Sequence, residues 1–96
     1  MTALATIKST LNQLKPELAR KFYVSSIGLF GSVVRADFNE KSDVDIIVDF
    51  SKPIGIEFID LADFIESKLK KKVDLVSKNG VKPKYFQQIE SEIIYV

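Results

Sequence analysis

The chain of 96 residues contains no cysteine and no histidine. Without cysteine it can form neither a disulfide nor a thiolate metal site, which fits a cytoplasmic protein. Without histidine it lacks the commonest general base and a common metal ligand. Any bound metal ion must therefore be held by oxygen atoms, and this favours Mg²⁺, Mn²⁺ or Ca²⁺ over Zn²⁺.

The chain also lacks an excess of charge, because 14 basic residues are balanced by 13 acidic ones and the net charge is +1. This balance gives no strong signal for nucleic-acid binding. No hydrophobic run reaches the length of a membrane span, and the N-terminus has no signal-peptide pattern. The length and the hydrophobic content of 46% predict a single domain over residues 1–96 with a thin stability margin.

Hydrophobic residues recur at helical spacing in two segments. The first, Leu4–Leu18, contains Pro16 and therefore predicts either a kinked helix or two helices. The second, Phe58–Leu69, has acidic residues near its start and lysines near its end, as the helix dipole favours. A proline in the first turn predicts a last, short helix over Pro83–Ile89.

Segments rich in β-branched residues lie between these helices. Strands are predicted at Val24–Phe30, Val44–Phe50 and Val73–Val76, and Ile93–Val96 fits either a helix end or an extended tail. The stretch GSVVRAD, which starts at Gly31, fits a tight turn and a short helix. The alternation predicts an α/β (α+β) fold, a small mixed sheet with helices packed on it.

Two acidic residues stand at the start of the most hydrophobic strand. Asp43 and Asp45 point to the same face, because strand side chains alternate, while alternate residues of Val44–Phe50 are free to pack on the other face. A divalent cation would satisfy both carboxylates and cancel their repulsion. The alternative is a pair of solvated loop residues. Asp49 shares their face but lies further along, and we interpret it as an exposed strand-end acid.

A third acid, Asp74, lies between Val73 and Leu75 inside the next predicted strand. An acid in a short hydrophobic strand is seldom buried unless it is paired or coordinated. If the two strands are neighbours, Asp74 can reach the same ion as the first two acids. The alternative is an edge strand in which Asp74 faces water.

The Gly31-Ser32 pair follows directly after the first predicted strand. Glycine permits a close approach of the backbone, and Ser32, as the predicted cap of the short helix, offers a hydroxyl and free N–H groups to a phosphate. Arg35 adds a guanidinium whose geometry matches phosphate oxygens. The alternative is ordinary helix capping beside a surface arginine.

The order Gly-Ser, Asp-x-Asp on a strand, a helix, and Asp on the next strand resembles the polymerase-β-like nucleotidyltransferase superfamily. The short length resembles its minimal, antitoxin-type (MNT) branch, and the resemblance runs from about Ser26 to Val76. The family commonly has glycine where this chain has Ala36. The resemblance implies that Gly31, Ser32 and Arg35 bind the triphosphate of ATP or another nucleotide. It also implies that three carboxylates are catalytic and bind Mg²⁺, with two ions expected and Mn²⁺ as a possible substitute: Asp43, Asp45 and Asp74.

The family resemblance implies an Mg²⁺-dependent nucleotidyltransferase that moves AMP from ATP to a hydroxyl group. The expected acceptor is a helical partner of the HEPN type, in a toxin–antitoxin pair, and a homo-oligomer is also compatible with the sequence. With no histidine, Asp74 or water must accept the proton of the hydroxyl. Two alternatives stay open: a catalytically silent antitoxin that occludes its partner, and a small domain with a structural ion.

Overall fold

A computed structural model describes residues 3–35, 37–39 and 41–96. Ala36 lies outside these residues. The three α-helices are α1 (Ala3–Phe22), α2 (Glu57–Leu69) and α3 (Pro83–Ile89), and two short 3₁₀ helices are η1 (Gly31–Val34) and η2 (Glu90–Glu92). The four strands are β1 (Val24–Phe30), β2 (Val44–Phe50), β3 (Val73–Ser77) and β4 (Ile94–Tyr95).

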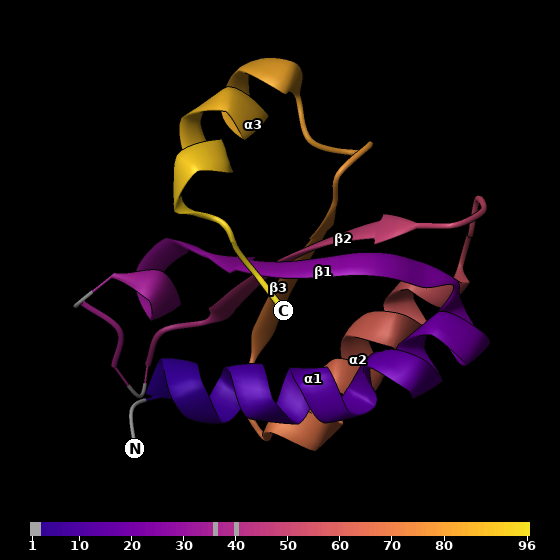
Figure 1. Cartoon of the computed structure of the whole chain (residues 1–96), viewed down its shortest axis with the longest axis horizontal. Coiled ribbons are helices and arrows are strands. Elements are labelled where there is room, and N and C mark those ends of the chain that lie inside the picture. Colours follow the sequence, from indigo (N-terminus) through magenta and orange to yellow (C-terminus); the bar gives the residue numbers. More distant parts are fainter. Residues whose placement is uncertain (1–2, 36, 40) are drawn as a thin grey trace.

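The strands form one mixed sheet in the order β3-β2-β1-β4. β1 is antiparallel to β2 and to β4, whereas β2 and β3 are parallel. The parallel pair requires a crossover, and α2 supplies it. Figure 1 shows α1 and α2 together on one side of the strands and α3 on the opposite side. The predicted mixed sheet with packed helices is therefore confirmed.

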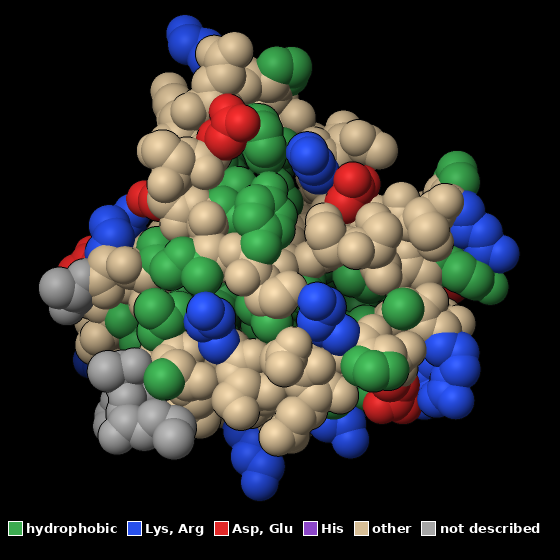
Figure 2. Space-filling view, viewed as in Figure 1, with side chains coloured by type: hydrophobic (Ala, Val, Ile, Leu, Met, Phe, Trp, Pro, Cys, Tyr) green, Lys and Arg blue, Asp and Glu red, His purple; other side chains and the backbone are tan. Residues whose placement is uncertain are grey.

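The larger part of the core lies between the sheet and the helices α1 and α2. Alternate residues of β2 point into it, as predicted from the strand period. On the opposite face a smaller cluster joins the sheet to α3, and Figure 2 shows hydrophobic side chains gathered there. The buried members of this smaller cluster are Phe30, Ile47 and Ile89. The acidic side chains of β2 and β3 share this less covered face.

Helix α1 is continuous through Pro16, so of the two alternatives the single helix is the one that forms, and two separate helices do not. An interior proline costs a helix about 3 kcal/mol. Leu11 and Leu18 flank it and are completely buried. Burying two leucine side chains contributes roughly 3–6 kcal/mol, which is enough to offset the proline. The packing of the hydrophobic face thus outweighs the local preference.

Two other local expectations need correction or completion. Ser32 does not cap η1, because the helix begins at Gly31 and the capping residue is Phe30, which makes no side-chain capping bond. Instead, the carbonyl of Ser32 accepts a hydrogen bond from the Arg35 N–H at 3.1 Å. The C-terminal segment is extended, since β4 pairs with β1. Within the described residues, no helix is long and hydrophobic enough to cross a membrane.

Candidate active site

The antiparallel pairing of β1 and β2 brings the Gly-Ser turn to the first aspartates. Phe30, the last residue of β1, is paired with Asp45, so Gly31 follows immediately beside that carboxylate. Gly31 has a positive φ of 74°, a conformation that side chains disfavour. A Cβ atom at this position would overlap the carboxylate of Asp45. The glycine is therefore needed both for its backbone conformation and for this close approach.

The parallel pairing of β2 and β3 places Asp74 directly opposite Asp45. Residues opposite each other in neighbouring strands point to the same face, so the two carboxylates are neighbours. β3 is an edge strand and Asp74 is exposed, as the alternative interpretation expected. Asp74 is therefore exposed to water and is also a neighbour of Asp45.

Asp45 is the electrostatically stressed member of this group. Its pKa is raised from 3.8 to about 6, first by partial burial and then by the negative charges of Asp74 and Asp43. The positive charge of Arg35 lowers the pKa, but it does not compensate for these effects. Within the described residues, no hydrogen-bond donor or salt-bridge partner stabilises the ionised form of Asp45. A positive charge placed next to Asp45 would therefore stabilise its ionised form.

The chemistry of these acids suits a hard cation that takes oxygen ligands. In residues 3–35, 37–39 and 41–96, however, no three acidic side chains are close enough to hold one ion together. Rotation of the exposed side chains of Asp43 and Asp74 toward Asp45 is needed to form such a site. The three acids thus fit a metal by residue type, and Asp45 and Asp74 also share a face of the sheet. The three-carboxylate metal site stays a prediction.

The turn after β1 offers two donors to an anion, and a carboxylate already uses both. The Gly31 N–H donates to Oε1 of Glu92 at 3.0 Å, and Nη1 of Arg35 lies 3.5 Å from Oε2 of the same residue. Arg35 also approaches Asp37, with Nε 3.5 Å from Oδ1. Ser32 follows Gly31 in the chain and is half-buried. The geometry therefore makes this turn an anion-binding element.

Glu92 was missed by the sequence reasoning. It lies 61 positions from Gly31, in η2 near the C-terminus, and no motif singles it out. The side chain retains 29% of its exposure, and its charge contributes to the raised pKa of Asp45. Only the folded C-terminal segment brings this fourth acid to the site.

Lysines surround the far side of Asp43. A hollow of about 370 Å³ is lined by Asp43, Ser42 and four lysines: Lys41, Lys70, Lys71 and Lys72. Lys70 is the C-terminal cap of α2, in a left-handed conformation with its N–H bonded to the Glu66 carbonyl, and Lys68 lies in the last turn as the helix dipole favours. Figure 2 shows lysine and arginine side chains spread around the molecule and not gathered on the visible face.

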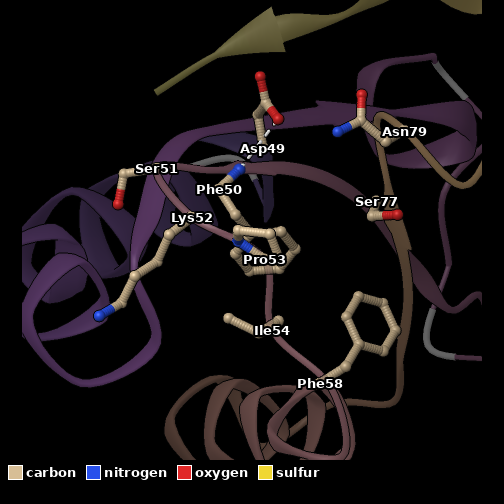
Figure 3. A pocket seen from close by; sticks show the side chains of 9 residues that line it. All are labelled: Asp49, Phe50, Ser51, Lys52, Pro53, Ile54, Phe58, Ser77 and Asn79. Carbon is tan, nitrogen blue, oxygen red and sulfur yellow. Dashed lines mark hydrogen bonds between the residues drawn. The ribbon is translucent and has the colours of Figure 1, made fainter.

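Another hollow, of about 520 Å³, lies at the other end of β2 and is not lined by Asp43, Asp45 or Asp74. Figure 3 shows its lining, in which Asp49 and Asn79 lie near the rim and Phe50, Ile54 and Phe58 supply hydrophobic surface. Asp49 is half-buried, not exposed as expected, and its carboxylate accepts a hydrogen bond from the Phe50 N–H at 3.0 Å. Four residues of strand, roughly 13 Å, separate it from Asp45. We find no catalytic constellation in this hollow.

Comparison with known proteins shows the family of the chain. Residues 11–96 match the family model described as a nucleotidyltransferase domain. The protein adenylyltransferase MntA of Thermococcus cleftensis is 42% identical over 97 residues, with 100% of this chain and 98% of the relative covered.

Two solved structures share the fold. A proposed minimal nucleotidyltransferase superposes with a TM-score of 0.82 at 29% identity and covers 98% of this chain and 95% of its own. A mutant of the toxin–antitoxin complex MntA-HpeT contains a chain with a TM-score of 0.70 at 26% identity, covering 88% of this chain and 69% of that one. In that mutant, two aspartates two positions apart are replaced by glutamate, and Asp43 and Asp45 have the same spacing.

Proposed function

The chain belongs to the nucleotidyltransferase domain family, and on this premise we propose that it is a protein adenylyltransferase that transfers AMP from ATP to a hydroxyl group of a partner protein. The relative in Thermococcus cleftensis, covered over nearly its whole length, carries the name of that activity. The MntA-HpeT complex supports a toxin–antitoxin context, in which the acceptor is a HEPN-type protein.

The observation that carries this proposal is the position of Asp45. It lies against Gly31 on one side and opposite Asp74 on the other, so the proposed nucleotide-binding turn and the proposed metal ligands meet at one carboxylate. Its pKa is raised first by partial burial and then by the negative charges of Asp74 and Asp43, so a positive charge beside it would be favourable. A site that must receive a positively charged ligand together with a phosphate has this charge distribution.

We assign Gly31, Ser32 and Arg35 to the triphosphate. The Gly31 N–H and the Arg35 guanidinium already hold an anion, so their orientation suits phosphate oxygens. Ser32, the residue after Gly31, offers a hydroxyl as a further donor. Because Gly31 lies against Asp45, a triphosphate on these groups would be held beside the aspartates, and such positioning reduces the entropic cost of reaction.

Three carboxylates would hold Mg²⁺, as one or two ions, with Mn²⁺ as a substitute: Asp43, Asp45 and Asp74. When bound, such ions stabilise the charge on the attacking and leaving oxygens of an in-line displacement. The acceptor oxygen bonds to the α-phosphorus, the bond to pyrophosphate breaks, and the acceptor becomes an AMP ester. Asp74 is exposed beside Asp45, so it can accept the proton that the hydroxyl loses.

A second candidate is an antitoxin that binds and occludes its partner without turnover. It is favoured by one observation: within the described residues, no three acidic side chains are arranged to hold a metal ion. Under this reading the acids would be remnants of a catalytic site, and binding alone would neutralise the partner.

A transfer assay separates the two candidates. We expect the protein, incubated with Mg²⁺, ATP labelled at the α-phosphate and the protein encoded beside it, to label that neighbour. Asp43→Asn should lower the rate on the order of 10³-fold or more, because a metal ligand is lost. Asp63→Asn, an exposed acid on α2, is the matched control and should retain the rate. Neutralisation of the neighbour without transfer from any of the four nucleotides would favour the occluding antitoxin.

A further inference from the structure

Glu92 presents both oxygens of its carboxylate to the anion-binding turn. One oxygen accepts the Gly31 N–H at 3.0 Å, and the other lies 3.5 Å from the Arg35 guanidinium. A phosphate group uses two of its oxygens in the same way when it binds a backbone N–H and an arginine. The described structure therefore holds a built-in anion on two of the three residues that we assign to the triphosphate.

The charge of Glu92 opposes the binding of a phosphate, as its contacts with the turn do. It adds a negative charge to the neighbourhood of Asp45, where Asp43 and Asp74 already repel an incoming anion. A triphosphate that binds Gly31 and Arg35 must displace this carboxylate from its donors. Its binding is also stronger once the negative charge of Glu92 has moved away, because the electrostatic repulsion is then smaller.

The C-terminal segment keeps the carboxylate close to its donors. Only Ile93 separates Glu92 from β4, and β4 is paired with β1 through Leu29 and Ile94. The last residue is also fixed, since the N–H of Val96 donates to the carbonyl of Ile27 at 2.9 Å. An anion tethered in this way has a high effective concentration, so it competes with a ligand in solution.

We propose that Glu92 is an internal competitor for the phosphate oxygens of the incoming nucleotide and thereby sets nucleotide affinity. This inference rests on the proposed function, because it takes Gly31 and Arg35 as triphosphate ligands. Under this inference Glu92 opposes nucleotide binding, whereas Gly31, Ser32 and Arg35 favour it. Because Glu92 lies in the C-terminal segment, that segment influences whether the turn binds a nucleotide.

The test compares Glu92→Gln with Glu90→Gln. The glutamine at 92 keeps the length and an oxygen that accepts the Gly31 N–H, but it removes the charge that pairs with Arg35. Glu90 lies in the same short helix and is exposed, so its substitution makes the same change of net charge away from the turn. Affinities for MgATP and for inorganic triphosphate are measured by titration calorimetry, and thermal melting checks that both variants fold.

We expect Glu92→Gln to bind MgATP and inorganic triphosphate roughly three- to tenfold more tightly than wild type, since a charged competitor becomes a neutral one. Glu90→Gln should bind like wild type. If wild type binds MgATP but Glu92→Gln binds it no more tightly, the inference is wrong and the proposed function stands. Weaker binding in Glu92→Gln would assign Glu92 to the groups that hold the nucleotide or its ion, and would also overturn the inference. If neither wild type nor variant binds MgATP, the proposed function itself is wrong.

Discussion

Replacing Asp45 by asparagine should stabilise the protein when no metal is present. Asparagine keeps the size of the side chain, so the contact with Gly31 is retained, while the charge that Asp43, Asp74 and Glu92 repel is removed. A pKa raised from 3.8 to about 6 corresponds to about 3 kcal/mol for a fully buried group. Asp45 is only half-buried, so solvent screening reduces the expected gain to about 1 kcal/mol.

The stabilisation should depend on pH in a definite direction. The folded protein binds the Asp45 proton more tightly than the unfolded chain does, so stability falls as the pH rises through the window from 3.8 to about 6. Above this window both states are ionised and the folded state carries the full penalty. Below it both states are protonated. The advantage of Asp45→Asn should therefore be complete near neutral pH and disappear in acid.

Thermal melting in chelator measures this effect. Near neutral pH we expect a rise in Tm of about 4–8 °C for 1 kcal/mol in a domain of this size. Asp63→Asn, an exposed acid on α2, removes the same charge and should change the unfolding free energy by less than about 0.5 kcal/mol. With MgATP at 100 times its Kd, wild type should gain about 2.7 kcal/mol, and Asp45→Asn should lose most of that gain. An Asp45→Asn variant that melts below wild type in chelator would refute the reasoning, because it would show that Asp45 stabilises the fold.

The remaining predictions concern the division of labour in the site. Asp74→Asn should slow transfer much more than it weakens MgATP binding, measured by calorimetry, because Asp43 and Asp45 remain to hold an ion while the group that acts on the acceptor hydroxyl is lost. Ser32→Ala should instead weaken MgATP binding first; equal loss of MgATP affinity in both variants would contradict these separate roles. Gly31→Ala should lower stability by at least about 1–2 kcal/mol and abolish MgATP binding, because a Cβ would be held at positive φ against Asp45. Gly55→Ala is the matched control, since its Cβ would meet only Glu57 Oε2 at 3.7 Å, and a Gly31→Ala variant that melts like it would disprove the close approach.

Much of the fold could be predicted because the hydrophobic pattern and the buried surfaces agree. The bounds Val24–Phe30 and Val44–Phe50 were predicted as the structure has them, and α3 was also predicted correctly. Both strands have a run of buried residues, and in β2 the sequence shows it as a dense run of β-branched side chains. The family resemblance is confirmed by the match over residues 11–96.

The errors arose where distant contacts outweigh local preference. Pro16 does not divide α1, because burial of the hydrophobic face on both sides of it outweighs its cost. Ser32 has the sequence signature of a cap, yet η1 starts one residue earlier so that Gly31 can lie against Asp45. Glu92 reaches the site from the C-terminal segment, whose pairing with β1 no local pattern specifies.

The surroundings of Asp45 argue against a structural role for this residue. A carboxylate that stabilises a fold accepts hydrogen bonds or pairs with a cation, and its pKa is lowered as a result. Gly31 lies against Asp45, but its N–H donates to Glu92 and not to Asp45. The pKa of Asp45 is raised. The fold thus keeps a half-buried acid beside other acids and assigns the available donor to a different carboxylate. Such an arrangement costs stability unless a ligand with positive charge completes it, which is the pattern expected of a binding site and not of a structural acid.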